Sequence, residues 1–318
     1  MIEFRYLQTG LTGMAQAHRA NTMAGHLGAA VVAGVFFCED HPDLPPEVVA
    51  AVQGELDRVI AGGEAIWFDQ KKAGVTIAEL FAPLPGGDPD PAAAAGIAAE
   101  LAKDIANLRQ SGHDAIFAAI ALRALRDHPQ AAAPAIAAGL RKLIAGFRGG
   151  SQGRGYFGKA KGWLQGADVA LPDDAGIPAY ADEDAMVEAV IGELIASAGV
   201  RRQGFGGLFH LINHAAALVE LARMGYADLA REGRAAHHRH LRLLRALPDV
   251  EAELGPLGKA KHDPLTAAYW AEDKDSEQWS AHLTHRIKTL YGFHTLLPLI
   301  EGETTRQKAL DAFRYLMA

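Results

Sequence analysis

The sequence predicts an all-α protein, and more specifically an α/α toroid of about four helical hairpins. Two observations predict this fold. Apolar residues recur at helical spacing along most of the chain, and a helix–turn–helix pattern that begins with a histidine returns after 87, 97 and 75 residues. The sequence holds no strand-like alternation of useful length. A chain of 318 residues with 49% hydrophobic content can bury such a core, so residues 1–318 are expected to form a single helical-repeat domain.

The first two copies of the hairpin align with each other. His26 precedes His41, the histidine of an Asp-His-Pro turn, by 15 residues, and His113 precedes its counterpart His128 by the same 15 residues. In each copy a helix rich in small residues runs to that turn, and a second helix ends in a similar stretch, GELDRVIAG or GLRKLIAG. Each copy therefore predicts two helices joined by a short turn.

Two further copies complete the set. In the third copy, His210 stands 15 residues before the Gly225 turn. In the fourth, the helix of His285 runs to the Glu301-Gly302 break, and TTRQKALDAFRYLMA supplies the second helix. The first helix of each copy is the more apolar, and the second carries more charge, which predicts an inner ring of buried helices within an outer ring of amphipathic ones. An open α-solenoid is the alternative architecture.

The repeat register places one histidine of each copy at the same height in its hairpin. If the ring closes, these side chains converge on one axis. Neutral imidazoles in a dry cavity suit a borderline divalent metal such as Fe(II), Zn, Ni or Cu, with geometry and availability deciding which. The alternative interpretation is that each histidine is a packed, hydrogen-bonded core residue. The predicted metal ligands are His26, His113, His210 and His285.

Lys288 stands one helical turn after His285. Because an ammonium group repels a cation, this lysine must lose its proton through burial, lie away from the metal, or be carboxylated by CO₂ into an oxygen ligand. We therefore predict it as a ligand or a catalytic base. His214 and His282 lie four residues after and three residues before a predicted ligand, on the same helical face, and are predicted as proton shuttles or additional ligands.

Residues 147–180 form a glycine-rich stretch that is expected to lie over the mouth of the ring. Arg154 and Tyr156 are candidate contacts to an acidic or phenolate substrate, although a plain solvated linker is the alternative. The GxxxxGK pattern in this stretch is not a P-loop, because Ala160 replaces the magnesium-binding serine or threonine. The run of residues 237–240, HHRH, is expected to be a solvated helix face.

Composition excludes several classes of protein. A net charge of −7 without a basic stripe argues against a nucleic-acid partner. The longest apolar run, Leu27–Cys38, is too short to cross a bilayer, and the N-terminus lacks the pattern of a signal peptide, so we expect a cytoplasmic protein without a membrane partner. Cys38 is the single cysteine, which excludes an internal disulfide and a cysteine-based zinc site.

Two stretches carry a resemblance to a known family. The helix with His285-Arg-Ile-Lys288 and the stretch GGLFHLINHAAALVEL resemble the questin oxidase-like proteins. That family is all-helical and includes oxygenases that oxidise or cleave the rings of anthraquinone-type polyketides. The resemblance implies a metal-assisted oxidation by O₂ of a small aromatic molecule. It also implies that the four repeat histidines are ligands and that Lys288 is a modified ligand or a base.

The sequence thus leads to one hypothesis and two alternatives. The hypothesis is a non-haem metal-dependent oxygenase in which residues 147–180 cover the site. One alternative is a helical-repeat binding or scaffold protein whose histidines are structural. The other is a metal-dependent hydrolase, in which a metal held by the same four histidines lowers the pKa of a bound water.

Overall fold

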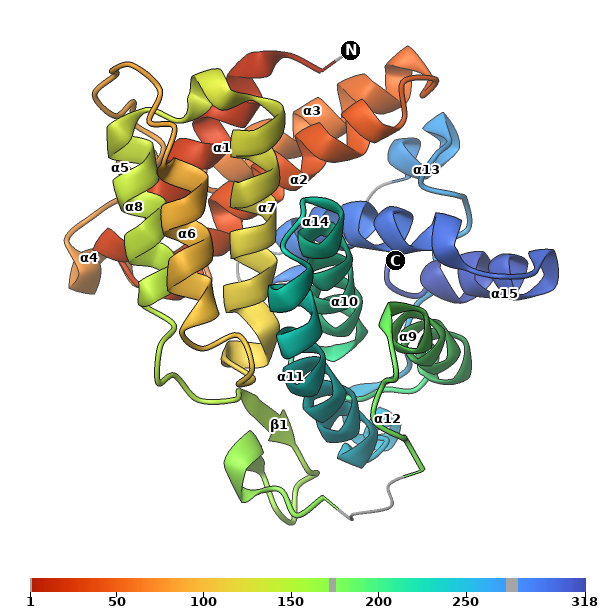
Figure 1. Cartoon of the computed structure of the whole chain (residues 1–318). Helices are drawn as coiled ribbons and strands as arrows, with labels where there is room; N and C mark the ends of the chain where they lie inside the picture. The colour runs from red at the N-terminus through yellow and green to blue at the C-terminus, as the bar shows by residue number, and fades with distance from the viewer. Residues whose placement is uncertain (1, 172–175, 273–279) are drawn as a thin grey trace. The chain divides into compact units, whose positions relative to one another are not determined.

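The computed structural model describes residues 2–171, 176–272 and 280–318, and it confirms the all-α class (Figure 1). Within these residues the only strands are β1 (Arg154–Tyr156) and β2 (Trp163–Gln165), which pair as a small antiparallel hairpin in the stretch predicted as a cover. The short helices are α4 (Gln70–Ala73), α5 (Ile77–Leu80), α12 (Glu251–Leu254) and α13 (Ala267–Ala271). The remaining helices outside the repeats are α1 (Phe4–Gln16), α6 (Ala93–Ala102) and α9 (Glu183–Ser197).

The helix pairs predicted from the repeats are all present. They are α2 (Gly25–Asp40) with α3 (Pro46–Ile60), α7 (His113–Asp127) with α8 (Pro134–Ala145), α10 (Gly207–Arg223) with α11 (Ala227–Ala246), and α14 (His282–Leu296) with α15 (Glu303–Phe313). Each of the four repeat histidines, His26, His113, His210 and His285, lies within the first turn of the first helix of its pair. The equivalence of the four histidines is therefore confirmed along the chain, while closure of a ring stays a prediction.

The chain divides into two compact units that are not continuous in sequence. Unit 1 comprises residues 1–103, 117–148 and 262–291, and unit 2 comprises residues 104–116, 149–261 and 292–318. Helices α7 and α14 each contribute residues to both units. The prediction of a single domain is therefore neither confirmed nor excluded, because each unit draws on segments from both halves of the chain.

The Asp-His-Pro turns end the first helices of the first two pairs. The Nδ1–H of His41 donates to the carbonyl of Phe37 at 2.8 Å, which satisfies one of the last carbonyls of α2. Proline then occupies the first position of the following helix, Pro46 in α3 and Pro134 in α8, where a missing N–H costs nothing. The local sequence thus fixes both hairpins.

Unit 1 is built around α1, which packs against both α2 and α8. Small residues permit the close approach. A Cβ at Gly28 would collide with the backbone of α1 at Met14 and Gly10, and one at Gly139 of α8 would collide with Ala15. Helix α6 packs against α8 (Figure 1).

One described segment, Thr22–Asp40, is long and apolar enough to cross a membrane by length and composition. The expectation from Leu27–Cys38 alone was of a run too short for this. The segment contains α2, and 83% of its most apolar window is buried in the protein, as in the core helix of a globular fold. Its apolar character is thus accounted for by packing.

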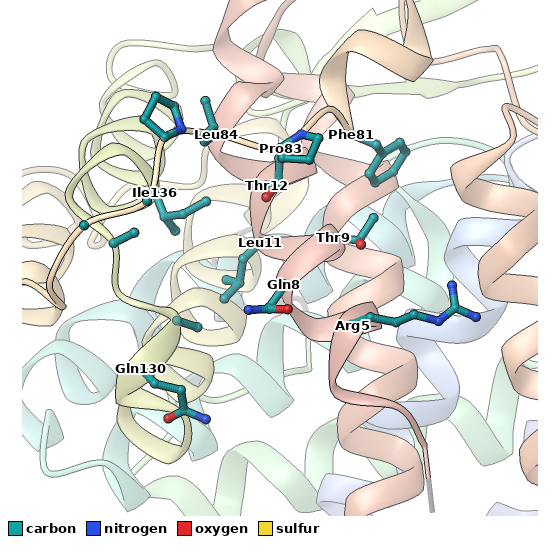
Figure 2. A pocket seen from close by; sticks show the side chains of 15 residues that line it. Arg5, Gln8, Thr9, Leu11, Thr12, Phe81, Pro83, Leu84, Gln130 and Ile136 are labelled. Carbon is teal, nitrogen blue, oxygen red and sulfur yellow. The ribbon is translucent and has the colours of Figure 1, made fainter.

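A surface pocket of about 370 Å³ opens beside α1 in unit 1 (Figure 2). One wall is the face of α1 from Arg5 to Thr12, and the facing wall is the loop that follows Phe81. The start of α8 and the short turn before it close the end at Gln130 and Ile136.

Unit 2 is built from α9, α10, α11 and α15, with α10 packed against both α9 and α11 and with α15 packed on α9. Glu193 of α9 is buried, and its carboxylate accepts hydrogen bonds from Arg202 at 2.8 Å and from Arg245 at 2.5 Å. Because both of its oxygens are engaged by guanidinium groups, this buried charge is matched.

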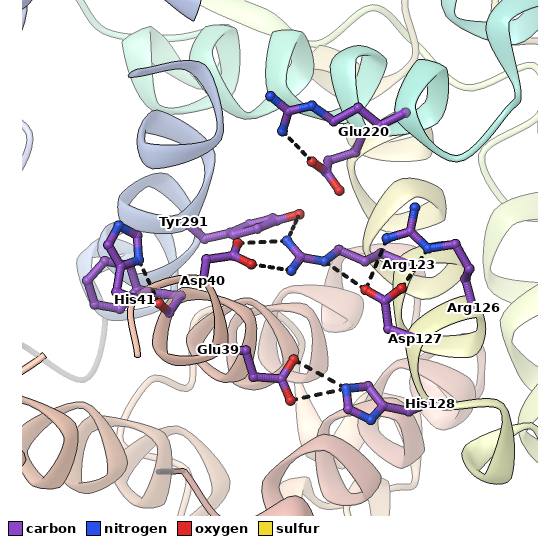
Figure 3. Close-up of polar contacts among 11 residues, drawn as sticks. Glu39, Asp40, His41, Arg123, Arg126, Asp127, His128, Glu220 and Tyr291 are labelled. Carbon is purple, nitrogen blue, oxygen red and sulfur yellow. Dashed lines mark hydrogen bonds and ion pairs between the residues drawn. The ribbon is translucent and has the colours of Figure 1, made fainter. Parts of the chain in front are cut away.

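A buried arginine of α7 links three segments of unit 1 (Figure 3). The guanidinium of Arg123 binds both carboxylate oxygens of Asp40 at 2.8 and 2.5 Å, where α2 ends, and it donates to the hydroxyl of Tyr291 on α14 at 3.2 Å. It also lies 4.2 Å above the ring of Phe36. This bidentate pair with an aromatic platform uses the planar shape that only arginine offers.

Replacing Arg123 by methionine removes the bidentate ion pair with Asp40, whose side chain is 39% exposed, and the cation–π contact with Phe36. We expect the free energy of unfolding to fall by about 1–2 kcal/mol, because charge-assisted hydrogen bonds are lost while the remaining carboxylate can be solvated. Arg126→Met is the matched control, because Arg126 is exposed and pairs with the neighbouring Asp127. Denaturant titration checks this, and equal losses in the two variants would contradict a structural role specific to Arg123.

Candidate functional site

Two of the predicted ligands, His26 and His285, lie side by side in unit 1. Their ring centroids are 5.1 Å apart, with the planes almost perpendicular at 81°. One potential ligand nitrogen of each ring lies within 4.8 Å of the other. His26 is fully buried and His285 is half-buried, so solvent reaches the pair from the side of His285.

Backbone carbonyls fix the tautomer of both rings. The Nδ1 atom of His26 lies 2.9 Å from the carbonyl of Met23, and that of His285 lies 2.7 Å from the carbonyl of Ala281. A carbonyl only accepts, so Nδ1 carries the hydrogen in each ring and Nε2 carries the lone pair. In metal-binding histidines, a hydrogen bond from the ring nitrogen that does not bind the metal typically fixes the orientation of the ring, and the Nδ1–H bonds to carbonyls are of this kind.

Aromatic rings surround the histidine pair. The indole of Trp67 stacks on His26, with centroids 3.6 Å apart and planes at 13°, and its centroid lies 5.5 Å from that of His285. The ring of Phe117 meets His26 edge-on at 5.4 Å. These flat faces exclude water from His26 and form an apolar wall.

Lys288 is buried behind these rings, with 2% of its surface exposed. Its Nζ atom lies 5.9 Å from the ring centroid of Trp67 and 5.6 Å from that of Phe117. Burial lowers the pKa of Lys288 to about 7, although the negative charge of Glu64 opposes the shift. Burial of the amine fits the first of the three interpretations offered for this lysine, loss of its proton, and the choice among the three stays a prediction.

Sequence analysis missed Glu64, the residue that holds this group together. It lies in the loop after α3 and is 1% exposed. Its carboxylate accepts hydrogen bonds from the backbone N–H of Leu283 at 2.8 Å and from the hydroxyl of Thr284 at 2.5 Å, at the start of α14. It also accepts the indole N–H of Trp67 at 2.8 Å. The available signal was a single acid between Gly62-Gly63 and an apolar stretch.

The other two predicted ligands, His113 and His210, lie together in unit 2. Their ring centroids are 4.3 Å apart. The Nδ1 atom of His210 lies 3.2 Å from the carbonyl of Ser111, and that of His113 is hydrogen-bonded to the carbonyl of Gln110. Both rings are buried, and their Nε2 atoms carry the lone pair, as in His26 and His285.

His214, a predicted shuttle, belongs to a second histidine group of unit 2. Its Nδ1 atom lies 3.4 Å from Nδ1 of His240, whose Nε2–H donates to the carbonyl of Phe205 at 2.7 Å. Tyr180 donates to Nδ1 of His237 at 3.1 Å, because the Nε2–H of that ring is used by the carbonyl of Leu211. Burial, followed by repulsion from the neighbouring imidazoles, lowers the pKa of His214 well below its usual range.

The expectation that residues 237–240 form a solvated face is wrong for two of the four. His237 and His240 have no exposed surface, and burial lowers their pKa values to about 3 and about 4. The two residues are three positions apart on α11, so both face α10, while His238 and Arg239 keep part of their surface exposed. Because all four residues of the run are polar, the sequence did not show which of them lie on the buried face of the helix.

The remaining predicted site residues lie at the surface of their own units. His282 is exposed at the start of α14 in unit 1. In unit 2, the guanidinium of Arg154 lies 4.8 Å above the ring of Trp163, and the Tyr156 hydroxyl donates to Glu253 at 2.8 Å. Residues 172–175 of the predicted cover lie outside the described residues. Substrate contact by Arg154 and Tyr156 stays a prediction.

No family model, curated protein or solved structure matches this chain. The resemblance to the questin oxidase-like proteins therefore stays a prediction that depends on the quoted motifs.

Replacing Glu64 by glutamine removes the charge and one acceptor atom while it keeps the shape. Leu283 bonds one carboxylate oxygen, while the Thr284 hydroxyl and Trp67 bond the other, so the amide NH2 group must face one of these two sets of donors. We therefore expect a loss of about 2 kcal/mol in unfolding free energy. Tryptophan fluorescence should also change, because the Trp67 indole loses its charged acceptor. Glu79→Gln, in the exposed cap of α5, is the control and should do neither. An unchanged emission spectrum in Glu64→Gln would contradict this role of Glu64.

Lys288→Met should stabilise the protein at neutral pH. The folded pKa of about 7 lies below the usual 10.5, so unfolding takes up a proton between these values. Burial of the lysine therefore costs most below pH 7, and the cost fades as the pH rises to 10.5. At pH 7 we expect the methionine variant to be more stable by roughly 2–4 kcal/mol. The measurement is denaturant unfolding of both proteins from pH 6 to 10. A difference that did not shrink with rising pH would refute the shifted pKa.

Proposed function

We propose that the chain is a metal-dependent oxygenase that oxidises a small aromatic molecule with O₂. The observation that carries the proposal is the pair of imidazoles of His26 and His285. Each Nδ1–H bonds a carbonyl, so Nε2 carries the lone pair, the donor type that Fe(II) and Zn accept. The repeat register predicts His113 and His210 as further ligands. The protein is expected to act in the cytoplasm.

The donor set of unit 1 fits a divalent metal. Both imidazoles are neutral ligands, and the adjacent lysine has a pKa of about 7, so its positive charge is largely lost under mildly alkaline conditions. A bound Fe(II) would supply the redox chemistry with O₂ that amino-acid side chains lack. The competing hydrolase would need the same two imidazoles, so the identity of the metal separates the two proposals.

The other groups of the site have roles that suit an aromatic substrate. The rings of Trp67 and Phe117 offer apolar faces on which a planar molecule can stack. Lys288, whose amine has a pKa of about 7 within this apolar wall, can in its neutral form accept a proton from a phenolic hydroxyl of the substrate. Both functions require the dry environment that buries His26.

Elemental analysis of untagged protein, purified without chelators or oxygen, tests the proposal. We expect close to one equivalent of iron, and an uptake of oxygen when a hydroxylated anthraquinone is added. His26→Ala and His285→Ala should each lose most of the metal, because each removes a ligand. His41→Ala is the matched control, since this ring also bonds a carbonyl through Nδ1 but ends a helix elsewhere in unit 1.

Three results would count against the proposal. Less than about a tenth of an equivalent of any transition metal would exclude both metal-dependent enzymes and favour the scaffold alternative. Zinc without iron would favour the hydrolase. Unchanged metal content in His26→Ala and His285→Ala, with lowered stability, would mean that these histidines are structural.

A further inference from the structure

The pocket of unit 1 in Figure 2 presents a row of hydrogen-bonding side chains that the metal site does not use. Gln8, Thr9 and Thr12 point from one face of α1, because residues three and four apart on a helix are neighbours. Gln130 adds a second carboxamide at the far end. None of these four side chains makes a hydrogen bond to another described residue of the protein.

Thr12 is the most informative member of this row. Its residue is only 7% exposed, yet its hydroxyl oxygen is not among the fully buried side-chain atoms that lack a partner, so this oxygen keeps accessible surface. A helical hydroxyl can donate to the carbonyl four residues earlier, as Ser197 does to Glu193 at 2.9 Å. Among the described residues Thr12 makes no such bond, and its oxygen faces the pocket (Figure 2). Its hydrogen-bonding capacity is thus directed to whatever fills the pocket.

The lining carries no charge that would require a charged ligand. Arg5 is its only ionisable residue, and it is engaged within the protein. Its Nε atom lies 2.9 Å from the carboxylate of Glu3, and it donates to the hydroxyl of Tyr6 at 2.9 Å. The other polar groups are amides and hydroxyls, each of which both donates and accepts. A neutral ligand with donors and acceptors matches this set.

Apolar faces complete the pocket. Phe81, Pro83 and Leu84 form the facing wall, with Leu11 and Ile136 at the base. The ring of Phe81 is held against α1, since a Cβ at Gly13 would come within 2.5 Å of it. A volume of about 370 Å³ is at the small end of ligand-binding cavities and suits a compact molecule.

We propose that this pocket binds a neutral, compact molecule with hydroxyl and amide groups on one side and C–H groups on the other, the chemistry of an acetamido sugar. Gln8, Gln130, Thr9 and Thr12 bond its polar groups, and Phe81 with the prolines of the loop covers its apolar face. The site is independent of the proposed metal chemistry, since it uses none of the same residues.

Titration calorimetry and saturation-transfer NMR with N-acetylglucosamine test the proposal, with glucose and the cationic glucosamine for comparison. We expect binding with a dissociation constant below about 10 mM, and weaker binding of glucosamine, which has no acetamide and carries a charge. Gln8→Ala and Thr12→Val should each weaken binding by about tenfold, the loss of one well-placed hydrogen bond. Thr9→Trp should fill the pocket and abolish binding.

Thr304→Trp, on the exposed first turn of α15, is the control for Thr9→Trp and should bind as the unaltered protein does. Circular dichroism and thermal unfolding show whether each variant is folded, and a variant that does not fold is replaced by Thr9→Phe. The proposal is overturned if N-acetylglucosamine does not bind, if glucosamine binds at least as tightly, or if Thr9→Trp binds it unchanged. Loss of metal in His26→Ala should leave this binding intact.

Discussion

The carboxylate of Glu64 is the contact on which the candidate site of unit 1 depends. The start of a buried helix exposes backbone N–H groups and the positive end of its dipole, and both require a partner. The Glu64 carboxylate places a negative charge at this end of α14 and accepts hydrogen bonds from the backbone N–H of Leu283 and the hydroxyl of Thr284. It also accepts the indole N–H of Trp67. One charge therefore sets the position of α14, which carries His285 and Lys288, and also the position of the ring that stacks on His26. A buried carboxylate is tolerated here because several donors surround it.

The same apolar surroundings determine the chemistry of the group. Burial among aromatic rings disfavours the charged amine and lowers the pKa of Lys288 to about 7. The charge of Glu64 moderates that shift, so the amine remains close to its titration point at neutral pH. Stability and function pull in opposite directions at this position, since the amine that serves the proposed chemistry is costly to bury.

Helix periodicity and turn chemistry allowed most of the fold to be predicted. The Asp-His-Pro turns, the apolar first helices and the register of the four histidines depend on local patterns, and the structure has each helix pair in its expected place.

Two features of the candidate sites could not be predicted from local sequence patterns. Glu64 lies in a loop and acts on a helix more than 200 residues later, and a single acid carries no spacing signal. His237 and His240 were misjudged because neighbouring polar residues hid which face of α11 they occupy. Which segments make up each compact unit was also beyond local pattern, since the repeat does not show which segments associate.

Three residues of unit 2 that are not glycine adopt left-handed backbone conformations, Gln110 at φ 44°, Ser111 at φ 61° and Phe205 at φ 49°. Side chains in this region cost of order 1 kcal/mol or more each, and glycine would relieve the cost. The carbonyls of these three residues receive the ring N–H of His113, His210 and His240. This backbone strain therefore predicts which residues related proteins should carry at the three positions. In lineages that have ceased to use these histidines, the three positions should drift toward glycine, and where the side chains persist they record selection on the orientation of the rings.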